Sequence, residues 1–216
     1  MFLKSIKTII FSFVLFFYLC PFSMAATHTV WSENFESYEV GTTSGGALDL
    51  NGIMVPWNAY APLCADWFEV RVNPNTGSKW MEARDLDGNG YWITGKIPIY
   101  GYTGVGISID IAEKGTLEWN DYMLLFYSIT DTISENRNWT LFDYRFNDFG
   151  KAESEISGLS GGYLSLGIVI RNDSNNERHG FDNVLVTAAT VPVPTSFLLL
   201  GSGIIGLIGY RRRNRQ

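Results

Sequence analysis

Residues 105–112 have the sequence Val-Gly-Ile-Ser-Ile-Asp-Ile-Ala, and this stretch decides the fold class. Large aliphatic side chains occupy every second position, and glycine, serine, aspartate or alanine stands between them. The same alternation returns at residues 164–170, Leu-Ser-Leu-Gly-Ile-Val-Ile. A side-chain period of two places one face of a strand in a core and the other face in solvent. The stretch therefore predicts antiparallel strands with one buried face.

Six further segments are predicted to be strands, and turn-forming residues separate them. The segments are 67–72, 79–84, 91–94, 122–130, 139–146 and 181–187. Clusters of Asn, Asp, Pro, Gly and Ser at 73–78 and 172–176 indicate turns. No twelve-residue window of this region keeps an apolar period of 3.6 residues. We expect an all-β fold, an antiparallel β-sandwich of the jelly-roll type, over residues 27–188.

The charge of the 216-residue chain is unevenly distributed. All 22 acidic residues lie between Glu33 and Asp182, where ten basic residues leave a formal net charge near −12. A body this acidic excludes a general nucleic-acid binder, which needs a basic surface. The remaining basic residues occur at the two ends of the chain, next to apolar runs.

The first 25 residues have the pattern of a secretory signal peptide. Lys4 and Lys7 precede an apolar run at 9–19, and the small residues Ser23 and Ala25 follow it. A helix of eleven residues is too short to cross a bilayer core of about 30 Å, but it suits a signal peptide. We expect a signal helix at 1–25, export, and cleavage by signal peptidase after Ala25. An uncleaved anchor is the alternative.

The last 26 residues combine a proline motif, an apolar run and a basic cluster. The marked positions are Val191, Pro192 and Pro194 at the start and Arg211, Arg212 and Arg213 near the end. The apolar run at 197–210 gives only about 21 Å of helix, so a span must include residues from 191 onward. We expect 191–216 to form a transmembrane helix that anchors the chain transiently in the inner membrane, with the arginines on the cytoplasmic side. A plain single-pass anchor is the alternative.

This tail resembles the PEP-CTERM sorting signal of Gram-negative bacteria. The resemblance covers residues 191–216 and includes all three elements in order. Val193 stands where the motif has its naming glutamate. The resemblance implies that exosortase, a membrane cysteine protease, processes the tail in a species that makes exopolysaccharide.

The body resembles concanavalin-like and MAM-like jelly rolls and carbohydrate-binding modules of the same architecture. The motifs that carry the resemblance are residues 33–36, 78–83, 119–124, 157–162 and 180–186. It implies that the first and last strands lie side by side near a structural calcium, with Glu36 and Asp182 as ligands. The alternative is that Asp182 bonds a turn backbone and Glu36 is solvated.

Two further local features leave alternatives open. Residues 85–90, Asp-Leu-Asp-Gly-Asn-Gly, match the front of a calcium loop, but Lys96 stands at position twelve, where such a loop requires glutamate. A Gly-Asn-Gly hairpin turn between two strands explains the same residues and is the favoured interpretation. Among the seven tryptophans, Trp57 in a proline-flanked segment and Trp92 beside this turn are the candidates for an exposed aromatic platform that stacks on sugars. Removal of the signal leaves Cys64 as the one cysteine, so no internal disulfide is expected.

We therefore expect a secreted, non-catalytic protein of the cell surface or extracellular matrix. Its expected partners are signal peptidase and exosortase as processing enzymes, and exopolysaccharide in a biofilm. A carbohydrate-binding module for an extracellular glycan is the alternative, and a polysaccharide-acting enzyme is a third possibility. No nucleophile, phosphate-loop or zinc-protease pattern in a suitable setting indicates catalysis.

Overall fold

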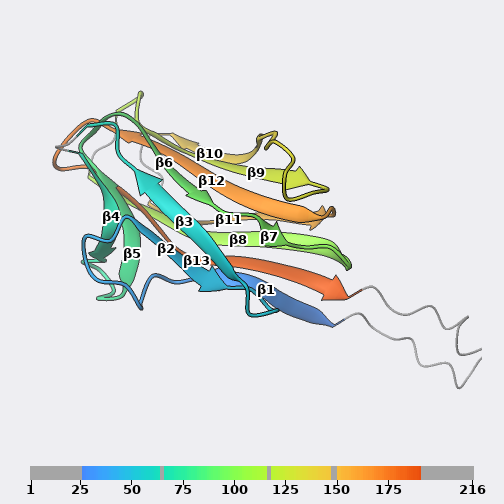
Figure 1. The fold of residues 1–216 in the computed structure, drawn as a ribbon. Helices are drawn as coiled ribbons and strands as arrows, with labels where there is room; N and C mark the ends of the chain where they lie inside the picture. Colours follow the sequence, from blue (N-terminus) through green and yellow to red (C-terminus); the bar gives the residue numbers. More distant parts are fainter. Residues whose placement is uncertain (1–25, 64–65, 116–117, 147–149, 191–216) are drawn as a thin grey trace, which may run out of the picture. The chain divides into compact units, whose positions relative to one another are not determined.

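A computed structural model describes residues 26–63, 66–115, 118–146 and 150–190. The predicted signal helix at 1–25, the predicted sorting helix at 191–216 and Cys64 lie outside the described residues. Thirteen strands form two antiparallel sheets in the part of the chain that is described (Figure 1). The prediction of an all-β antiparallel sandwich is confirmed. Within the same residues, no helix has the length and apolarity to cross a membrane.

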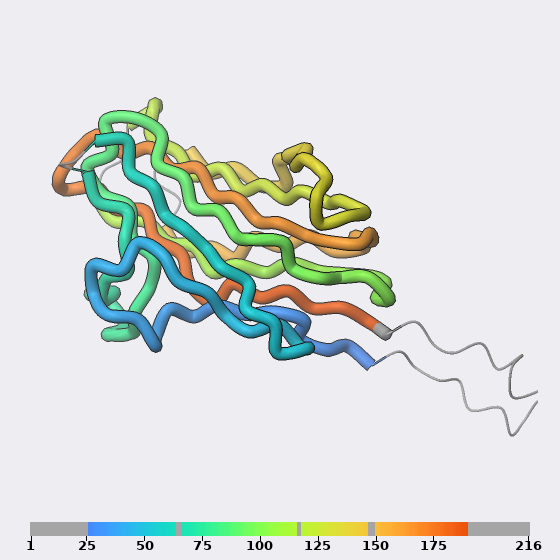
Figure 2. Tube along the Cα trace, in the orientation of Figure 1, coloured from blue at the N-terminus to red at the C-terminus, as the bar shows by residue number. Residues whose placement is uncertain are grey.

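The first sheet, which we call the β13 sheet, has the order β11-β8-β13-β5-β4, with β1 also paired to β13. Its strands are β1 (Thr27–Glu33), β4 (Trp67–Val72), β5 (Lys79–Arg84), β8 (Tyr102–Lys114), β11 (Lys151–Leu159) and β13 (Arg178–Thr190). On one side β13 pairs with β8 along most of its length. On the other side it pairs with β5 through Phe181 and with β1 from Val184 onward. The first and last strands therefore lie side by side (Figure 2).

The second sheet, the β12 sheet, has the order β10-β9-β12-β6-β3-β2, with β7 also paired to β12. Its strands are β2 (Ser44–Leu48), β3 (Met54–Tyr60), β6 (Leu86–Thr94), β7 (Ile97–Pro98), β9 (Tyr122–Thr130), β10 (Thr140–Phe146) and β12 (Tyr163–Asn172). The two sheets meet at their edges. The Ser154 hydroxyl of β11 donates to the Asp143 carboxylate of β10, and a bridge joins Trp31 of β1 to Asp49 after β2.

The alternating stretch at 105–112 lies within β8, and its aliphatic residues are buried as the period of two requires. Val105, Ile107, Ile109 and Ile111 all point into the sandwich. Leu164, Leu166, Ile168 and Ile170 of β12 do the same from the opposite sheet. These two central strands supply much of the aliphatic part of the core.

Edge-to-face aromatic rings fill the end of the core near β6. The Phe35 ring lies 5.5 Å from Trp57 and 5.7 Å from Phe181, and Trp92 lies 5.1 Å from Phe181, all in T-shaped contacts. Such contacts add about 0.5–1.5 kcal/mol each to the burial of ring surface. Phe35 reaches this position with a φ of 59°, a left-handed conformation that turns the chain out of β1. Large rings from both sheets therefore fix the sheets against each other.

The interpretation of residues 85–90 needs correction, because these residues form neither a hairpin turn nor a calcium loop. Asp85 alone, with a φ of 56°, connects β5 in one sheet to β6 in the other. The run from Leu86 onward is already strand, and Gly90 pairs with Ile170 of β12. Glycines in this strand leave room for large neighbours: a Cβ on Gly90 would lie 2.7 Å from the Leu86 side chain and 3.0 Å from the Phe68 ring.

Candidate functional site

A row of tyrosines crosses the outer face of the β12 sheet. Tyr60 of β3 pairs with Tyr91 of β6, Tyr91 with Val169 of β12, Val169 with Leu124 of β9, and Leu124 with Tyr144 of β10. Directly opposed residues of antiparallel strands share a face. The exposed fractions of Tyr60, Tyr91 and Tyr144 are 66%, 39% and 59%, so this face is in solvent. We call these three tyrosines, with Leu124 and Val169 between them, the aromatic row.

A second group of rings lies beside the β10 end of the row. The Tyr122 ring of β9 lies 6.0 Å from Phe146 of β10, and Phe146 lies 5.4 Å from Tyr144. The Tyr122 hydroxyl donates to the Asn89 carboxamide oxygen at 2.5 Å, and this contact passes over β12 to reach β6. The row therefore carries hydrogen-bonding groups next to its apolar surfaces.

Trp139, the residue before β10, covers the middle of the same face. A Cβ on Gly167 of β12 would lie 3.1 Å from the Trp139 ring, so the indole packs directly on the glycine backbone. The Arg137 guanidinium lies 5.9 Å from the Trp139 ring centroid and donates through Nε to the Ser165 hydroxyl at 3.0 Å. The loop between β9 and β10 thus places an aromatic ring and a cation above this face of the sheet.

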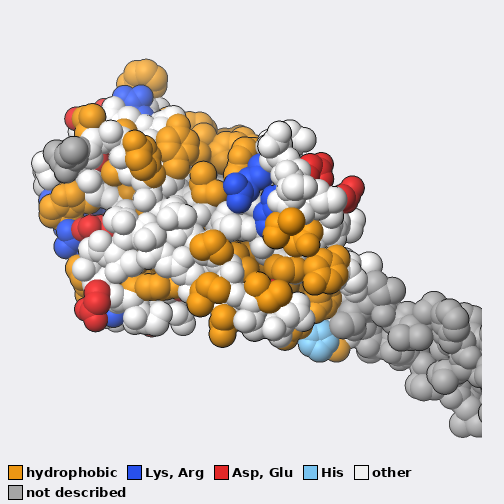
Figure 3. Space-filling view, in the orientation of Figure 1, with side chains coloured by type: hydrophobic (Ala, Val, Ile, Leu, Met, Phe, Trp, Pro, Cys, Tyr) orange, Lys and Arg blue, Asp and Glu red, His pale blue; other side chains and the backbone are white. Residues whose placement is uncertain are grey.

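This surface differs from the usual solvent face of an antiparallel sheet, which is mostly polar. Figure 3 shows hydrophobic side chains spread over the face that β3, β6, β12 and β9 present, with few acidic side chains near its centre. Exposed aromatic and aliphatic groups gathered in one place mark interaction surfaces in soluble proteins. Flat rings with hydroxyl and amide groups beside them suit ligands that have both apolar faces and polar edges.

The prediction that Trp57 and Trp92 form an exposed platform is wrong. Both side chains are fully buried. Trp57 belongs to β3, where Val55 and Ala59 also point inward, and its indole N–H donates to Glu33 at 2.7 Å. Trp92 belongs to β6 and points into the core on the same strand face as Leu86 and Thr94. A change of one position reverses the face of a strand, so Tyr91 is the exposed neighbour.

Glu36 and Asp182, the expected calcium ligands, lie in one neighbourhood beside the gap that β1 and β5 leave along β13. Burial raises the pKa of Asp182 to about 6, and the charges of Glu36, Asp110 and Glu33 add to the increase. The Lys79 backbone N–H donates to Glu36 at 2.9 Å. The Asn183 backbone N–H donates to Asp182 at 2.7 Å, which is the turn contact of the alternative interpretation. The calcium assignment therefore stays a prediction.

A groove of about 460 Å³ opens on the outer face of the β13 sheet beside Asp182. Asp110 of β8 is directly opposite Asp182 in the strand register, and the Asn183 side-chain amide donates to Asp110 at 2.8 Å. Lys151 and Glu153 of β11 also line the groove. Three carboxylates therefore line this groove from the neighbouring strands β11, β8 and β13.

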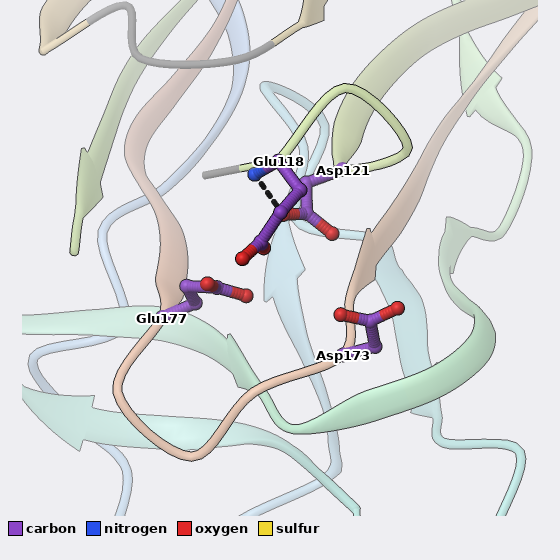
Figure 4. Close-up of side chains that lie close together, drawn as sticks. All are labelled: Glu118, Asp121, Asp173 and Glu177. Atoms are coloured by element: carbon purple, nitrogen blue, oxygen red, sulfur yellow. Dashed lines mark hydrogen bonds between the residues drawn. The ribbon is translucent and has the colours of Figure 1, made fainter. Parts of the chain in front are cut away.

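The sequence interpretation missed a third acidic group, formed by Glu118, Asp121, Asp173 and Glu177 (Figure 4). The first two precede β9, and the other two belong to the connection between β12 and β13. Ligand atoms of all four lie within 4.8 Å of one another, so the group could hold a metal ion. Burial, then the carboxylates of Glu118, Asp121 and Asp173, raise the pKa of Glu177 to about 7. No local motif links residues so far apart in sequence, so only the fold brings them together.

The C-terminal residues 190–213 match the PEP-CTERM protein-sorting motif. The predicted resemblance of the tail to this sorting signal is confirmed, and the motif implies export, anchoring by a C-terminal signal in Gram-negative bacteria and processing by exosortase. The transmembrane helix at 191–216 stays a prediction. The matched range contains the proline motif and the arginine cluster. No curated protein matches the chain.

Several solved structures are similar to the body at low identity. The CBM22-1 xylan-binding domain of Paenibacillus barcinonensis Xyn10C is 12% identical, with 78% of this chain and 99% of that chain covered and a TM-score of 0.46. The K3 cleaved adhesin domain of Lys-gingipain from Porphyromonas gingivalis is 11% identical, with 75% and 99% covered and a TM-score of 0.47. The CBM22-1–GH10 modules of a Clostridium thermocellum endo-1,4-beta-D-xylanase, complexed with xylohexaose, are 18% identical with a TM-score of 0.43. There 77% of this chain is covered, but it spans only 29% of the xylanase chain.

Proposed function

We propose that this protein is a secreted, non-catalytic, carbohydrate-binding component of the cell surface or extracellular matrix. The observation that carries the proposal is the aromatic row on the outer face of the β12 sheet. Its tyrosines are open to solvent although they stand on a strand face that polar residues usually occupy. Aromatic faces stack on the apolar faces of sugar rings, and the hydroxyl edges of the rings then meet polar groups such as Asn89.

The shape of the row favours an extended polysaccharide. From β10 to β3 the row crosses four steps between strands of about 4.8 Å, so it is on the order of 19 Å long. Its outer tyrosines, Tyr60 and Tyr144, are more exposed than the central Tyr91. A linear chain of sugars laid across the strands would therefore contact all three rings. A protein partner is the other class of ligand for such a surface, and the binding experiment below separates the two.

The two ends of the chain supply the delivery route in this proposal. Signal peptidase removes residues 1–25, and the C-terminal helix holds the acidic body outside the inner membrane until exosortase acts near the proline motif. The released body then joins the exopolysaccharide of the surface or biofilm, and that exopolysaccharide is the proposed ligand.

Affinity electrophoresis of the mature protein through gels that contain purified exopolysaccharide tests this function. We expect the polysaccharide to retard the wild-type protein and to retard the Tyr91→Ala/Tyr144→Ala double variant much less. Trp67→Ala is the matched control, because Trp67 is similarly exposed but lies on β4 of the other sheet. Equal retardation of the double variant and the wild type would remove the aromatic row as the binding surface.

We also propose that Glu36 and Asp182 bind a structural calcium. Oxygen ligands from both ends of the body would fasten Asp182 of β13 to the chain that follows β1, and Ca²⁺ prefers such carboxylate oxygens. Asp182→Asn should then lower the calcium-induced increase in melting temperature. An increase of the same size in this variant would contradict the assignment.

One observation favours a second candidate function, a polysaccharide-acting enzyme. Asp110 and Asp182 face the same groove, and glycoside hydrolysis uses pairs of carboxyl groups. The raised pKa of Asp182 suits a general acid. Release of reducing ends from exopolysaccharide by wild type but not by Asp182→Asn would establish this function, and no release by either would exclude it for that substrate.

A further inference from the structure

We propose that Glu118, Asp121, Asp173 and Glu177 form a calcium site that fastens the segment before β9 to the β12–β13 connection. We call this group the loop cluster. It is separate from Glu36 and Asp182, and the proposal does not depend on carbohydrate binding.

The spacing of the four carboxylates suits one large cation. Ca²⁺ binds six to eight oxygens at 2.3–2.6 Å, so two oxygens on one ion lie at most about 5 Å apart. One ligand atom from each residue of the loop cluster lies within 4.8 Å of the others. Figure 4 shows carboxylates from the two segments turned toward a common space. The donors are all oxygens, which favours a hard cation over zinc.

The buried half of the loop cluster points independently to a missing ligand. Asp121 is 0% exposed and Glu177 is 4% exposed. Among the described residues, Asp121 Oδ1 and Glu177 Oε2 are buried and have no hydrogen-bond partner. A buried carboxylate oxygen without a partner is costly, and adjacent negative charges increase the cost. A bound cation would satisfy both oxygens at once.

The existing contacts hold the carboxylates in place but do not neutralise them. The Glu118 backbone N–H donates to Asp121 Oδ2 at 2.6 Å, and the Glu177 backbone N–H donates to the Ser174 carbonyl at 3.1 Å. Asp173 accepts from the Asn120 amide at 2.9 Å and pairs with the Arg171 guanidinium at 3.7 Å. Arg171 is the one cation that forms an ion pair with these four residues in the described part of the chain. Four carboxylates with a single guanidinium leave three formal negative charges.

Two residues of the loop cluster are buried and two are exposed, so an ion there has protein on one side and water on the other. Such a site keeps some water ligands, and extracellular calcium modules of this kind bind with dissociation constants of about 10⁻⁴–10⁻³ M. Export places the protein where calcium reaches such concentrations. The site would then be filled after secretion and would order the end of the sandwich.

Terbium luminescence and thermal melting of the mature protein test the proposal. Tb³⁺ replaces Ca²⁺ at oxygen sites and emits when a nearby tryptophan is excited; Trp119, 85% exposed, is the neighbour of Glu118 in the chain. We expect Tb³⁺ emission that CaCl₂ displaces and that Trp119→Phe reduces several-fold, with Ca²⁺ affinity within twofold of wild type. Asp121→Asn/Glu177→Gln should abolish the emission and the calcium-induced increase in melting temperature.

A matched variant separates the two calcium proposals. Glu36→Gln/Asp182→Asn should leave Tb³⁺ emission through Trp119 unchanged. In a chelator, the loop-cluster double variant should melt at or above the wild-type temperature, because it removes two buried charges; this result also shows that the variant folds. Emission and calcium affinity that persist in the loop-cluster variant, or absence of any response to 5 mM CaCl₂ in the wild type, would overturn the proposal.

Discussion

The outer faces of the two sheets carry aromatic residues in opposite ways. On the β13 sheet, the guanidinium carbons of Arg71 and Arg84 lie 4.3 Å and 5.0 Å from the ring centroid of Trp67. Trp80 on the same face is buried against Gly180 and donates to Glu82 at 3.1 Å. On the β12 sheet, the tyrosines of the aromatic row remain open. The alternation of side chains places residues on the outer face of each sheet in the same way. The two outer faces therefore differ in the groups that cover their aromatic rings.

The comparison shows which face is free to bind. Ion pairs between Arg71 and Glu69 and between Arg178 and Glu82 surround the tryptophans of the β13 sheet. These charges occupy the ring faces that a ligand would use. On the β12 sheet, Trp139 packs on the Gly167 backbone with Arg137 beside it, but the tyrosines of the aromatic row remain exposed to solvent. The aromatic row is therefore the surface whose ring faces are open to a ligand.

The largest effect is expected when alanine replaces Trp92, and the matched comparison is alanine at the neighbouring Tyr91. Trp92→Ala should reduce the free energy of unfolding by about 3–5 kcal/mol, because it empties the aromatic core. Tyr91→Ala should cost roughly 1 kcal/mol or less, because its ring is on the open face. Urea denaturation of both variants measures the difference. Similar losses for the two would contradict the assignment of faces in β6.

We expect an effect of intermediate size from pH, which should change stability through a buried histidine of β13. Desolvation lowers the pKa of buried His179 to about 3, against 6.5 for an exposed histidine. Because the folded state keeps the imidazole ring neutral, the contribution of this ring to the free energy of unfolding is complete above pH 6.5. That contribution declines as the pH falls toward 3. At pH 5 the loss is on the order of 2 kcal/mol. With a chelator present, the free energy of unfolding of His179→Gln should fall less between pH 7 and pH 5 than that of the wild type. Parallel curves of unfolding free energy against pH would contradict the neutral buried ring.

The aromatic row itself predicts a moderate effect confined to binding. Tyr144→Ala should weaken exopolysaccharide binding roughly tenfold, or about 1.4 kcal/mol, with little change in the free energy of unfolding. Affinity electrophoresis measures the first quantity and urea denaturation the second. A tenfold loss accompanied by partial unfolding would attribute the effect to structure and not to contact with the ligand.

The smallest effect is expected for the charges over the other sheet. Arg71→Gln removes a partly exposed ion pair and a cation–π contact, and such interactions contribute about 1 kcal/mol or less each. Binding of exopolysaccharide should not change. If this variant bound exopolysaccharide more tightly than the wild type, the result would show that the arginine blocks binding to Trp67 on the β13 sheet.

The sequence predicted the fold well where strands are long and strictly alternating. β4, β5 and β9 coincide with the predicted segments, and β8 and β12 contain them. The prediction overlooked five strands, β1, β2, β3, β7 and β11. Of these, β2 has two glycines, and the proline of β3 suggested irregular chain. Pairing of β3 with β6 begins at Trp57, just after Pro56, so the missing N–H of proline costs no contact there.

The candidate sites were less predictable because each depends on contacts distant in sequence. The choice of Trp92 over Tyr91 reversed a face, because the sequence predicted a turn before a strand at 91–94, whereas β6 already begins five residues earlier at Leu86. The loop cluster joins carboxylates more than fifty residues apart, and only the pairing of β9 with β12 brings them together. The sorting motif could be predicted from the sequence because all its elements are contiguous and depend on local composition.

Chemical-shift mapping of the isotope-labelled mature protein during titration with exopolysaccharide fragments tests the central claim most directly. We predict that saturable shifts will be concentrated on Tyr60, Tyr91, Tyr144 and their cross-strand neighbours on the β12 sheet, while Trp67 and Arg71 on the β13 sheet remain unchanged. Saturable shifts concentrated on the β13 sheet, or no shifts at saturating fragment concentration, would contradict the account.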